Sequence, residues 1–427
     1  MKIHGSMLPG KLAPIALGSL TQDLTSVMNR YVGKKPDTPL TVETLEQVQQ
    51  KFWTSSSTSD VGDDNLMRNI WTVCDGHVKE LITKQETKSP INHTTSKKSP
   101  VVYSTREGID VAIGLNQNGG GLEAASLDVN PGGSTINVAR ALANFGSQFN
   151  LIGVHGNGPK GDAFIKSLRN EGTIKGDFVI GRTDGRTHFC TPYGAQEYWL
   201  VDALPELIAD DVDLLTNKVL EACKKNEKEA LALANGGPSG THETYMPDIV
   251  GITQDKHGMF TIYDPKKNAV SKDDVIAVLE KSPGLIKPNL VELGELTDTE
   301  ESSLRQDRDL IVHLAQELIK QFGVKMVLVS MDKDGALLID RKRAVYGNAP
   351  KIVVASPGCA GDTGIAALID RSKKENFSLH KPNDTQFKNM LKAFLGGGAA
   401  TAAKPGSNLG TLEEAQELEK QVKANFI

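Results

Sequence analysis

The feature that most constrains the fold is an alternation of short apolar runs with amphipathic stretches beyond residue 98. The runs are VVYS (101–104), FNLIGV (149–154), ALALAN (230–235), MFTIYD (259–264), GLIKPN (284–289) and KMVLVSM (325–331). Helical spacing of apolar residues separates most of them. Strands that alternate with helices run parallel, and crossover helices cover the sheet. Residues 99–427 are therefore predicted to form one α/β sandwich domain, with ligands at the carboxyl ends of its strands.

The first 98 residues have a different pattern. Three segments place apolar side chains on one helical face: LTQDLTSVMNRYV (20–32), TVETLEQVQQKF (41–52) and NLMRNIWTVCDGHVKELI (65–82). Two polar stretches, 54–64 and 84–100, follow the second and third segments, and the latter stretch has the composition of a linker. The sequence thus predicts a helical N-terminal extension and linker over 1–98.

Composition argues against several kinds of partner. Lysine and arginine number 48 against 53 acidic residues, and the formal net charge of −5 disfavours nucleic acid or an anionic membrane. The four cysteines are widely spaced, which indicates a reducing compartment rather than a disulfide framework. Pro9, Lys11 and Pro14 interrupt the N-terminal apolar stretch, so no signal peptide is predicted. A cytoplasmic protein is expected.

One stretch, SPGCAGDTGIAAL (356–368), combines small residues, an aspartate and an apolar run with helical spacing. It has two interpretations. In the first, Gly358 and Gly361 let the backbone turn and Asp362 caps the helix that follows. In the second, the backbone amides at the helix start bind phosphate, and Asp362 takes a proton from an attacking hydroxyl.

Other motifs are absent or weak. The chain has no G-x-x-x-x-G-K-[ST] loop, no G-x-S-x-G elbow and no His/Cys cluster with zinc spacing. GNGPKG (156–161) matches G-x-G-x-x-G, but Pro159 removes an amide from the loop. A turn is therefore favoured over a dinucleotide site.

Three stretches resemble the signatures of the ribokinase-like, or PfkB, carbohydrate kinases and occur in the family's order. They are PGGSTINVARALANFGSQFNLIGVHGNGPKGDAF (131–164), LIKPNLVELGEL (285–296) and SPGCAGDTGIAAL (356–368). The stretch 185–215 is similar to the phosphofructokinase and tagatose-6-phosphate kinase branch. The resemblance implies a three-layer sandwich with a mostly parallel central sheet, and a small β lid with strands at about 111–130 and 186–202.

The resemblance also implies roles for individual residues. Asp362 would be the catalytic base, and the amides of Cys359, Ala360 and Gly361 would form an anion hole. The substrate-binding residues would be Asp110, Gly132, Gly133, Asn137 and Arg186. The nucleotide- and phosphate-binding residues would be Lys287, Asn289, Ser330 and Gly335. Asn289 and Glu292 would organise Mg²⁺ through water, ATP would be the second substrate, and lid strands would pair two subunits into a homodimer.

Several positions depart from the family pattern. Ser134 stands where phosphosugar kinases often have lysine, and Glu123 stands where a basic residue would hold a substrate phosphate. Asp332 stands where glycine is usual, and Cys359 replaces the first glycine of the anion hole, where a positive φ would be costly. The leading hypothesis is an ATP-dependent kinase acting on a primary hydroxyl of a sugar or sugar phosphate. The alternatives are a non-catalytic sugar- or nucleotide-binding regulatory protein and a nucleoside kinase.

Overall fold

The N-terminal extension consists of three helices, as the periodicity predicts. The structure, a computed structural model, describes residues 14–54, 64–84, 98–118, 121–171, 174, 176–193, 196–266 and 270–427. The helices are α1 (Pro14–Tyr31), α2 (Val42–Thr54) and α3 (Asp64–Lys84). Most of the two polar stretches lies outside the described residues.

A ten-stranded sheet forms the centre of the larger domain. Its order is β14-β13-β12-β11-β10-β9-β8-β1-β4-β5. The parallel strands are β1 (Val101–Tyr103), β4 (Asn150–His155), β5 (Gly176–Ile180), β8 (Ala230–Ala234), β9 (Phe260–Asp264), β10 (Leu285–Ile286) and β11 (Met326–Ser330). The antiparallel strands at one edge are β12 (Ala336–Asp340), β13 (Ala344–Gly347) and β14 (Ala424–Phe426). The six apolar runs therefore form six of the parallel strands.

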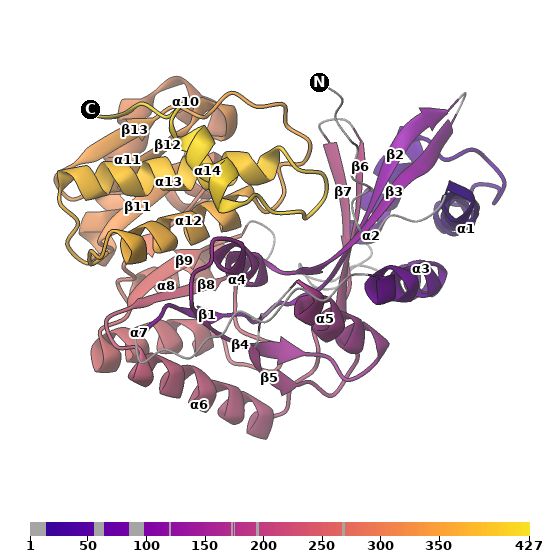
Figure 1. Cartoon of the computed structure of the whole chain (residues 1–427), viewed down its shortest axis with the longest axis horizontal. Helices are drawn as coiled ribbons and strands as arrows, with labels where there is room; N and C mark the ends of the chain where they lie inside the picture. Colours follow the sequence, from indigo (N-terminus) through magenta and orange to yellow (C-terminus); the bar gives the residue numbers. More distant parts are fainter. Residues whose placement is uncertain are drawn as a thin grey trace.

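Helices cover both faces of this sheet and complete three layers (Figure 1). One face carries α4 (Ser134–Asn144), α5 (Pro159–Asn170), α12 (Ala360–Lys374), α13 (Asp384–Ala402) and α14 (Leu412–Glu419). The other carries α6 (Ala209–Lys225), α7 (Tyr245–His257), α8 (Lys272–Leu279), α9 (Leu290–Thr297), α10 (Glu301–Gln306) and α11 (Arg308–Phe322). In β11, Met326 and Leu328 pack into the first layer, and Val327 and Val329 pack into the second. Burial on both faces explains why these strands are continuous apolar runs.

A second sheet of four strands forms the predicted lid. Its order is β3-β2-β6-β7, with β2 (Gly108–Asn118), β3 (Gly121–Gly132), β6 (Arg186–Tyr193) and β7 (Gln196–Val201). β2 pairs antiparallel with β3 and parallel with β6. Figure 1 shows this sheet standing away from the central sheet, with α1 and α3 on its far side.

The extension buries the outer, apolar face of the lid sheet. Leu24, Leu45 and Ile70 share one apolar cluster with Val111 and Phe189 of the lid. The extension also bonds to the edge strand β3, because the Leu122 amide donates to the Leu40 carbonyl at 2.6 Å. Removing these apolar side chains from water stabilises the packing of the extension against the lid.

The extension also contacts the larger domain through α5. The Asn170 amide nitrogen donates to the Ile82 carbonyl at 2.8 Å, and Lys166 Nζ donates to Thr83 Oγ1 at 3.0 Å. The three helices therefore bridge the lid and the body. Among the described residues, no helix is long and apolar enough to span a membrane.

Candidate active site

Asp362 lies in the first turn of α12 with its carboxylate held from two sides. Asn137 Nδ2, from α4, donates to Asp362 Oδ2 at 3.0 Å, and Lys266 Nζ lies 3.2 Å from Oδ1. The Asp362 side chain is 6 % exposed. The residue before α12 is Cys359, so Asp362 is the third helical residue, not the cap. The helix-cap interpretation is therefore wrong, and the carboxylate faces other elements of the fold.

The start of α12 leaves backbone amides unpaired beside this carboxylate. In the part of the chain that the structure describes, the amides of Cys359, Ala360 and Gly361 donate to no other backbone group. Unpaired amides at a helix start attract anions. A Cβ on Gly361 would lie 3.2 Å from Lys287 Nζ, so this glycine lets a lysine lie next to the amides. The predicted anion hole is thus open and flanked by a cation.

Cys359 adopts the backbone conformation that made its presence unexpected. Its φ is +62°, in the left-handed region that favours glycine. Its Sγ lies 3.2 Å from Asn137 Nδ2, which also holds Asp362. Burial raises the pKa of the thiol, and Asp362 and Asp110 raise it further. The Cys359 thiol is therefore protonated, and it lies against Asn137.

Two lysines and a buried aspartate extend the site along the carboxyl edge of the central sheet. Asp264 ends β9 and is 1 % exposed. Its Oδ1 pairs with Lys287 Nζ at 2.9 Å, and its Oδ2 pairs with Lys266 Nζ at 2.8 Å. Lys266 therefore lies between Asp264 and Asp362. This arrangement places two positive charges beside the unpaired amides of α12.

Asn289 and Glu292 form the N-terminal capping box of α9. Asn289 Oδ1 accepts from the Glu292 amide at 2.8 Å, and Glu292 Oε2 accepts from the Asn289 amide at 2.8 Å. Glu292 is only 6 % exposed, so it is not an ordinary solvated glutamate. Burial raises the pKa of Glu292, and Lys287 opposes this shift. The local fold thus fixes the N-x-x-E pair at the end of β10.

Ser330 and Gly335 lie beside this pair, at the end of β11 and the start of β12. Ser330 forms an isolated bridge with Asn289. Gly335 has a φ of +92°, and a Cβ there would come within 2.0 Å of the Gly347 carbonyl oxygen. The turn thus requires glycine at 335. Lys287, which is 4 % exposed, lies just before the N-x-x-E pair in the chain and binds Asp264.

Asp332, which stands where the family usually has glycine, has a cationic partner. Arg305 Nη2 lies 3.1 Å from Asp332 Oδ2, and Arg305 Nη1 lies 3.6 Å from Asp334 Oδ2. Asp332 has a φ of +51°, which accounts for the glycine usual at this position. An arginine therefore offsets the negative charge near the predicted nucleotide loop.

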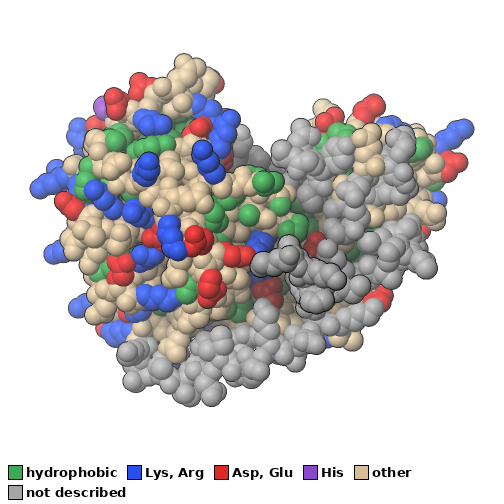
Figure 2. Space-filling view, turned by 45° about the horizontal axis from the view of Figure 1, so that its top comes forward, with side chains coloured by type: hydrophobic (Ala, Val, Ile, Leu, Met, Phe, Trp, Pro, Cys, Tyr) green, Lys and Arg blue, Asp and Glu red, His purple; other side chains and the backbone are tan. Residues whose placement is uncertain are grey.

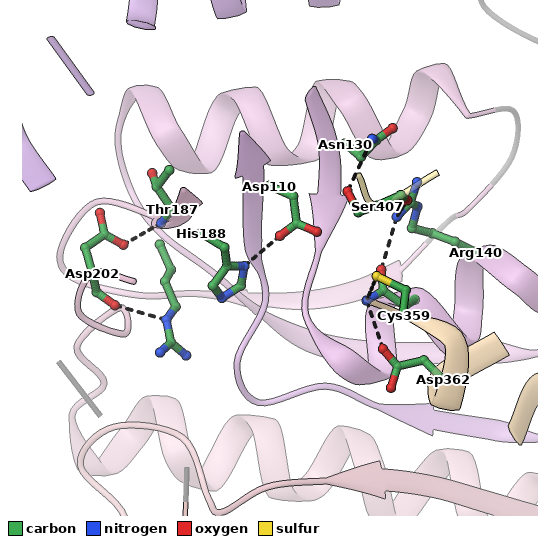
Figure 3. Close-up of polar contacts among 11 residues, drawn as sticks. Asp110, Asn130, Arg140, Thr187, His188, Asp202, Cys359, Asp362 and Ser407 are labelled. Atoms are coloured by element: carbon green, nitrogen blue, oxygen red, sulfur yellow. Dashed lines mark hydrogen bonds and ion pairs between the residues drawn. The ribbon is translucent and has the colours of Figure 1, made fainter. Parts of the chain in front are cut away.

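The lid contributes Asp110, which requires glycine at its neighbour. A Cβ on Gly132 would lie 1.7 Å from Asp110 Oδ1, so any other residue there would displace the Asp110 carboxylate. Asp110 Oδ1 pairs with His188 Nδ1 at 2.8 Å, from the adjacent strand β6 (Figure 3). Gly133 has a φ of +112° and caps α4, which carries Asn137. Asp110 comes from the lid and Asn137 from the body, and both are buried.

Arg186 and Arg140 are both buried near these residues. Arg186, the first residue of β6, donates from Nε to the Asp202 carbonyl at 3.0 Å and is 6 % exposed. Arg140 donates to Asn137 Oδ1 at 3.0 Å and forms a two-point ion pair with Glu171. Arg140 thereby orients the Asn137 amide toward Asp362 (Figure 3). The structure does not bring Arg186 into contact with Asp362.

The GNGPKG loop is a turn, as predicted. Asp184 Oδ1 accepts from the amides of Lys160 and Gly161 at 2.9 and 3.3 Å. These amides begin α5 and are already paired. The Glu123 side chain, expected to repel a substrate phosphate, lies outside the described residues.

Sequence reasoning missed Lys266, Asp264, His188 and Arg140. The first two had a usable signal, because they end an apolar strand-like run, and the carboxyl ends of parallel strands meet at one edge. Arg140 lies three residues after Asn137 on α4, so helical spacing could have marked it. His188 pairs with Asp110 from 78 residues away, and no local pattern marks it. Figure 2 shows hydrophobic side chains gathered where the body surface falls away into the notch beside the lid.

Comparisons with known proteins identify the family. The model of the pfkB family carbohydrate kinases matches residues 104–381. A 1-phosphofructokinase of Borreliella burgdorferi is 27% identical over 293 residues, which cover 68% of this chain and 85% of that protein.

Solved structures share the fold. Phosphofructokinase-2 from Escherichia coli has a TM-score of 0.63 and 24% identity, covering 76% of this chain and 99% of that one. A ribokinase from Thermotoga maritima has a TM-score of 0.55 and 17% identity, covering 76% of this chain and 100% of that one. These values confirm the ribokinase-like fold. Because the family model matches well over half of the sequence, the chain belongs to the pfkB family and is an ATP-dependent carbohydrate kinase.

Proposed function

We propose that this kinase transfers the γ-phosphoryl group of ATP to a primary hydroxyl of a sugar phosphate. Asp362 takes the hydroxyl proton while the hydroxyl oxygen attacks the γ-phosphorus and ADP leaves in line. The observation that carries the proposal is the position of Asp362. Its buried carboxylate is fixed by Asn137 and Lys266 beside the unpaired amides of α12.

Fixed amides and lysines supply positive potential where charge gathers in the transferring group. The amides of residues 359–361 point from a helix start and need no reorganisation during the reaction. Lys266 and Lys287 add two positive charges next to them. In phosphoryl transfer, positioning and electrostatic stabilisation supply most of the catalysis.

In this proposal, Lys266 supplies the positive charge between the Asp362 carboxylate and the transferring phosphoryl group. Without it, the Asp362 carboxylate would face the negative phosphoryl oxygens with no cation beside it. The Lys266 ammonium lies 3.2 Å from that carboxylate and its side chain is 30 % exposed, so it can also reach a bound phosphoryl group. Lys266 thereby reduces the repulsion between the Asp362 carboxylate and the phosphoryl oxygens.

The sugar is held between lid and body in this proposal. Asp110 from β2 and Asn137 from α4 hydrogen-bond its hydroxyls, and Gly132 and Gly133 allow close backbone approach. Arg186 at the start of β6 is the candidate for the substrate phosphate. The name of the Borreliella relative supports a phosphorylated sugar as the substrate class.

The residues present fit Mg²⁺ bound with ATP. The described residues contain no group of three His, Cys, Asp or Glu side chains with metal-ligand geometry. Mg²⁺ commonly keeps several waters and uses only one or two carboxylates plus phosphates, so Glu292 and Asn289 can hold it through water. The ion would neutralise phosphate charge. The protein's part is to fix Glu292 in the α9 capping box.

A panel of sugars, sugar phosphates and nucleosides with ATP tests this function. We expect turnover on a sugar phosphate, and we expect Asp362→Asn to lower kcat about 10²- to 10⁴-fold with substrate binding retained. Asp370→Asn, on the same helix, is the matched control and should keep its activity. Equal kcat for wild type and Asp362→Asn would exclude Asp362 as the base. Binding by wild type with no turnover would favour the regulatory alternative, and a preference for nucleosides would favour the nucleoside kinase.

We propose that a homodimer of this protein uses a surface other than the outer face of the lid, because the N-terminal extension already covers that face. The relatives include a phosphofructokinase-2 solved as a tetrameric inhibited form. In this chain, the extension occupies the outer lid face and bonds to β3. We propose that the extension takes the place that a second lid would need.

A further inference from the structure

A hollow on the surface lies at the opposite edge of the central sheet from the candidate active site. Its volume is about 660 Å³, within the range of small-molecule sites. It lies where α11 ends and β11 begins, beside the β12–β13 turn and the loop before α13. Asp264 and Ser330, in contrast, lie at the carboxyl ends of β9 and β11. The hollow is therefore separate from the catalytic residues.

The rim of the hollow carries an excess of positive charge. Its cationic side chains are Lys325, Arg341, Lys342, Arg343 and Lys381. Arg343 binds both acidic side chains of the lining, at 2.7 Å to Asp340 and 2.9 Å to Asp384. Among the residues that the structure describes, the other four cations form no ion pair with a carboxylate.

His380 leaves the charge of Lys325 uncompensated. Lys325 Nζ lies 2.9 Å from His380 Nδ1, and His380 Nε2 lies 3.0 Å from the Gly258 carbonyl oxygen. The imidazole therefore donates from Nε2 and accepts at Nδ1, which makes it neutral. Burial and Lys325 lower the pKa of His380, and burial and Lys381 lower the pKa of Lys325. Neighbouring lysines therefore contribute to both pKa shifts, which indicates that positive charge is concentrated here.

The floor of the hollow is apolar. Ile319, Val324, Met326 and Pro382 line it beneath the cationic rim. An anion with an organic part would place its charge among the lysines and its apolar part on this floor. Inorganic ions would use only the rim.

We propose that this hollow binds an organic phosphate, a small phosphate ester whose charge is held by Lys325, Lys342 and Lys381. The site is distinct from the one at α12, and a ligand there would offset the mutual repulsion of the four unpaired cations. β11 and β12 form an antiparallel pair that runs between the hollow and the predicted nucleotide loop. The proposed ligand would thus bind at one end of the β11–β12 pair, and Ser330 and Gly335 lie at the other end.

Calorimetric titration with inorganic pyrophosphate in EDTA tests the phosphate-binding part of the proposal. The full-length wild type should bind one more equivalent than the variant Lys325→Ala/Lys381→Ala. Lys224→Ala/Lys225→Ala, which removes two exposed lysines from α6, is the charge-matched control and should bind as wild type does. Lys342→Glu should weaken the additional site at least tenfold, because reversed charge repels the anion.

Hydrogen exchange locates the additional site. Pyrophosphate should protect residues 319–326 and 340–343 in wild type and in the control, and not in Lys325→Ala/Lys381→Ala. Because these lysines repel each other, the double variant should melt no lower than wild type without anion. Identical isotherms for wild type and the double variant would overturn the proposal. An equal loss in the α6 control would also overturn it, by showing general attraction to a basic surface.

Discussion

Replacing Lys266 by methionine isolates the charge that lies between Asp264 and Asp362. The ammonium is 2.8 Å from Asp264 and 3.2 Å from Asp362. Asp264 keeps Lys287 at 2.9 Å in the variant, so the buried aspartate retains a partner. Of the partners of Asp362 among the described residues, the Asn137 amide remains. The substitution thus removes the cation from the proposed base while leaving the framework paired.

The magnitude follows from the geometry. The charges that matter are the Lys266 ammonium and an oxygen of the transferring phosphoryl group, because Asp362 loses its own charge as it takes the proton. Two unit charges 4 Å apart at an effective dielectric of about 20 attract by about 4 kcal/mol. Because the Lys266 side chain is 30 % exposed, solvent reduces this toward the about 1.5–3 kcal/mol of a charged hydrogen bond. At about 1.4 kcal/mol for each factor of ten, kcat should fall by about 10- to 150-fold. KM for the sugar should change little, since Lys266 contacts none of the proposed sugar-binding residues.

The assay is ATP-dependent ADP release with the best sugar substrate, with kcat and both KM values measured. Lys373→Met is the matched control, because Lys373 is 37 % exposed and pairs with Glu229 at 2.7 Å, in the last turn of α12 and away from the site at its start. Lys266→Arg should recover part of the lost kcat. If Lys266→Met turns over within threefold of Lys373→Met, or if only its melting temperature falls, the electrostatic reasoning is refuted.

Three further predictions concern the lid, a buried acid and the extension. Gly132→Ala should raise the KM for the sugar at least tenfold, because its Cβ would lie 1.7 Å from Asp110 Oδ1. Gly76→Ala, with open space around it, is the control and should leave KM unchanged. Equal KM values for the two variants would contradict this prediction. Burial raises the pKa of Glu107 to about 8 from 4.5, so the folded chain keeps a proton that the unfolded chain loses, and stability should fall as pH rises from about 5 to 8. Glu107→Gln should reduce that slope in urea unfolding, and an unchanged slope would show that Glu107 is not its source. A chain that begins at Lys98 should expose the outer lid face and self-associate in light scattering; a monomer with unchanged melting temperature would show that the extension does not protect that face.

Local patterns in the sequence predicted much of this structure. The apolar runs became strands and the three N-terminal segments became helices, because both periodicities depend on neighbours in the chain. Gly132 lies where a side chain would collide with Asp110, and Gly133 has a positive φ. The resemblance to the family assigned Asp362 and Asn137 to one site, and the structure brings their side chains within 3.0 Å.

Only the tertiary structure decided the contacts between distant segments. Lys266 meets Asp362 across 96 residues, and Arg305 offsets Asp332 across 27, because sheet order and helix packing place their side chains together. The extension lies on the lid because each has an apolar face that the other buries. Sequence periodicity shows that a face is apolar, but which surface covers it depends on the packing of the whole chain.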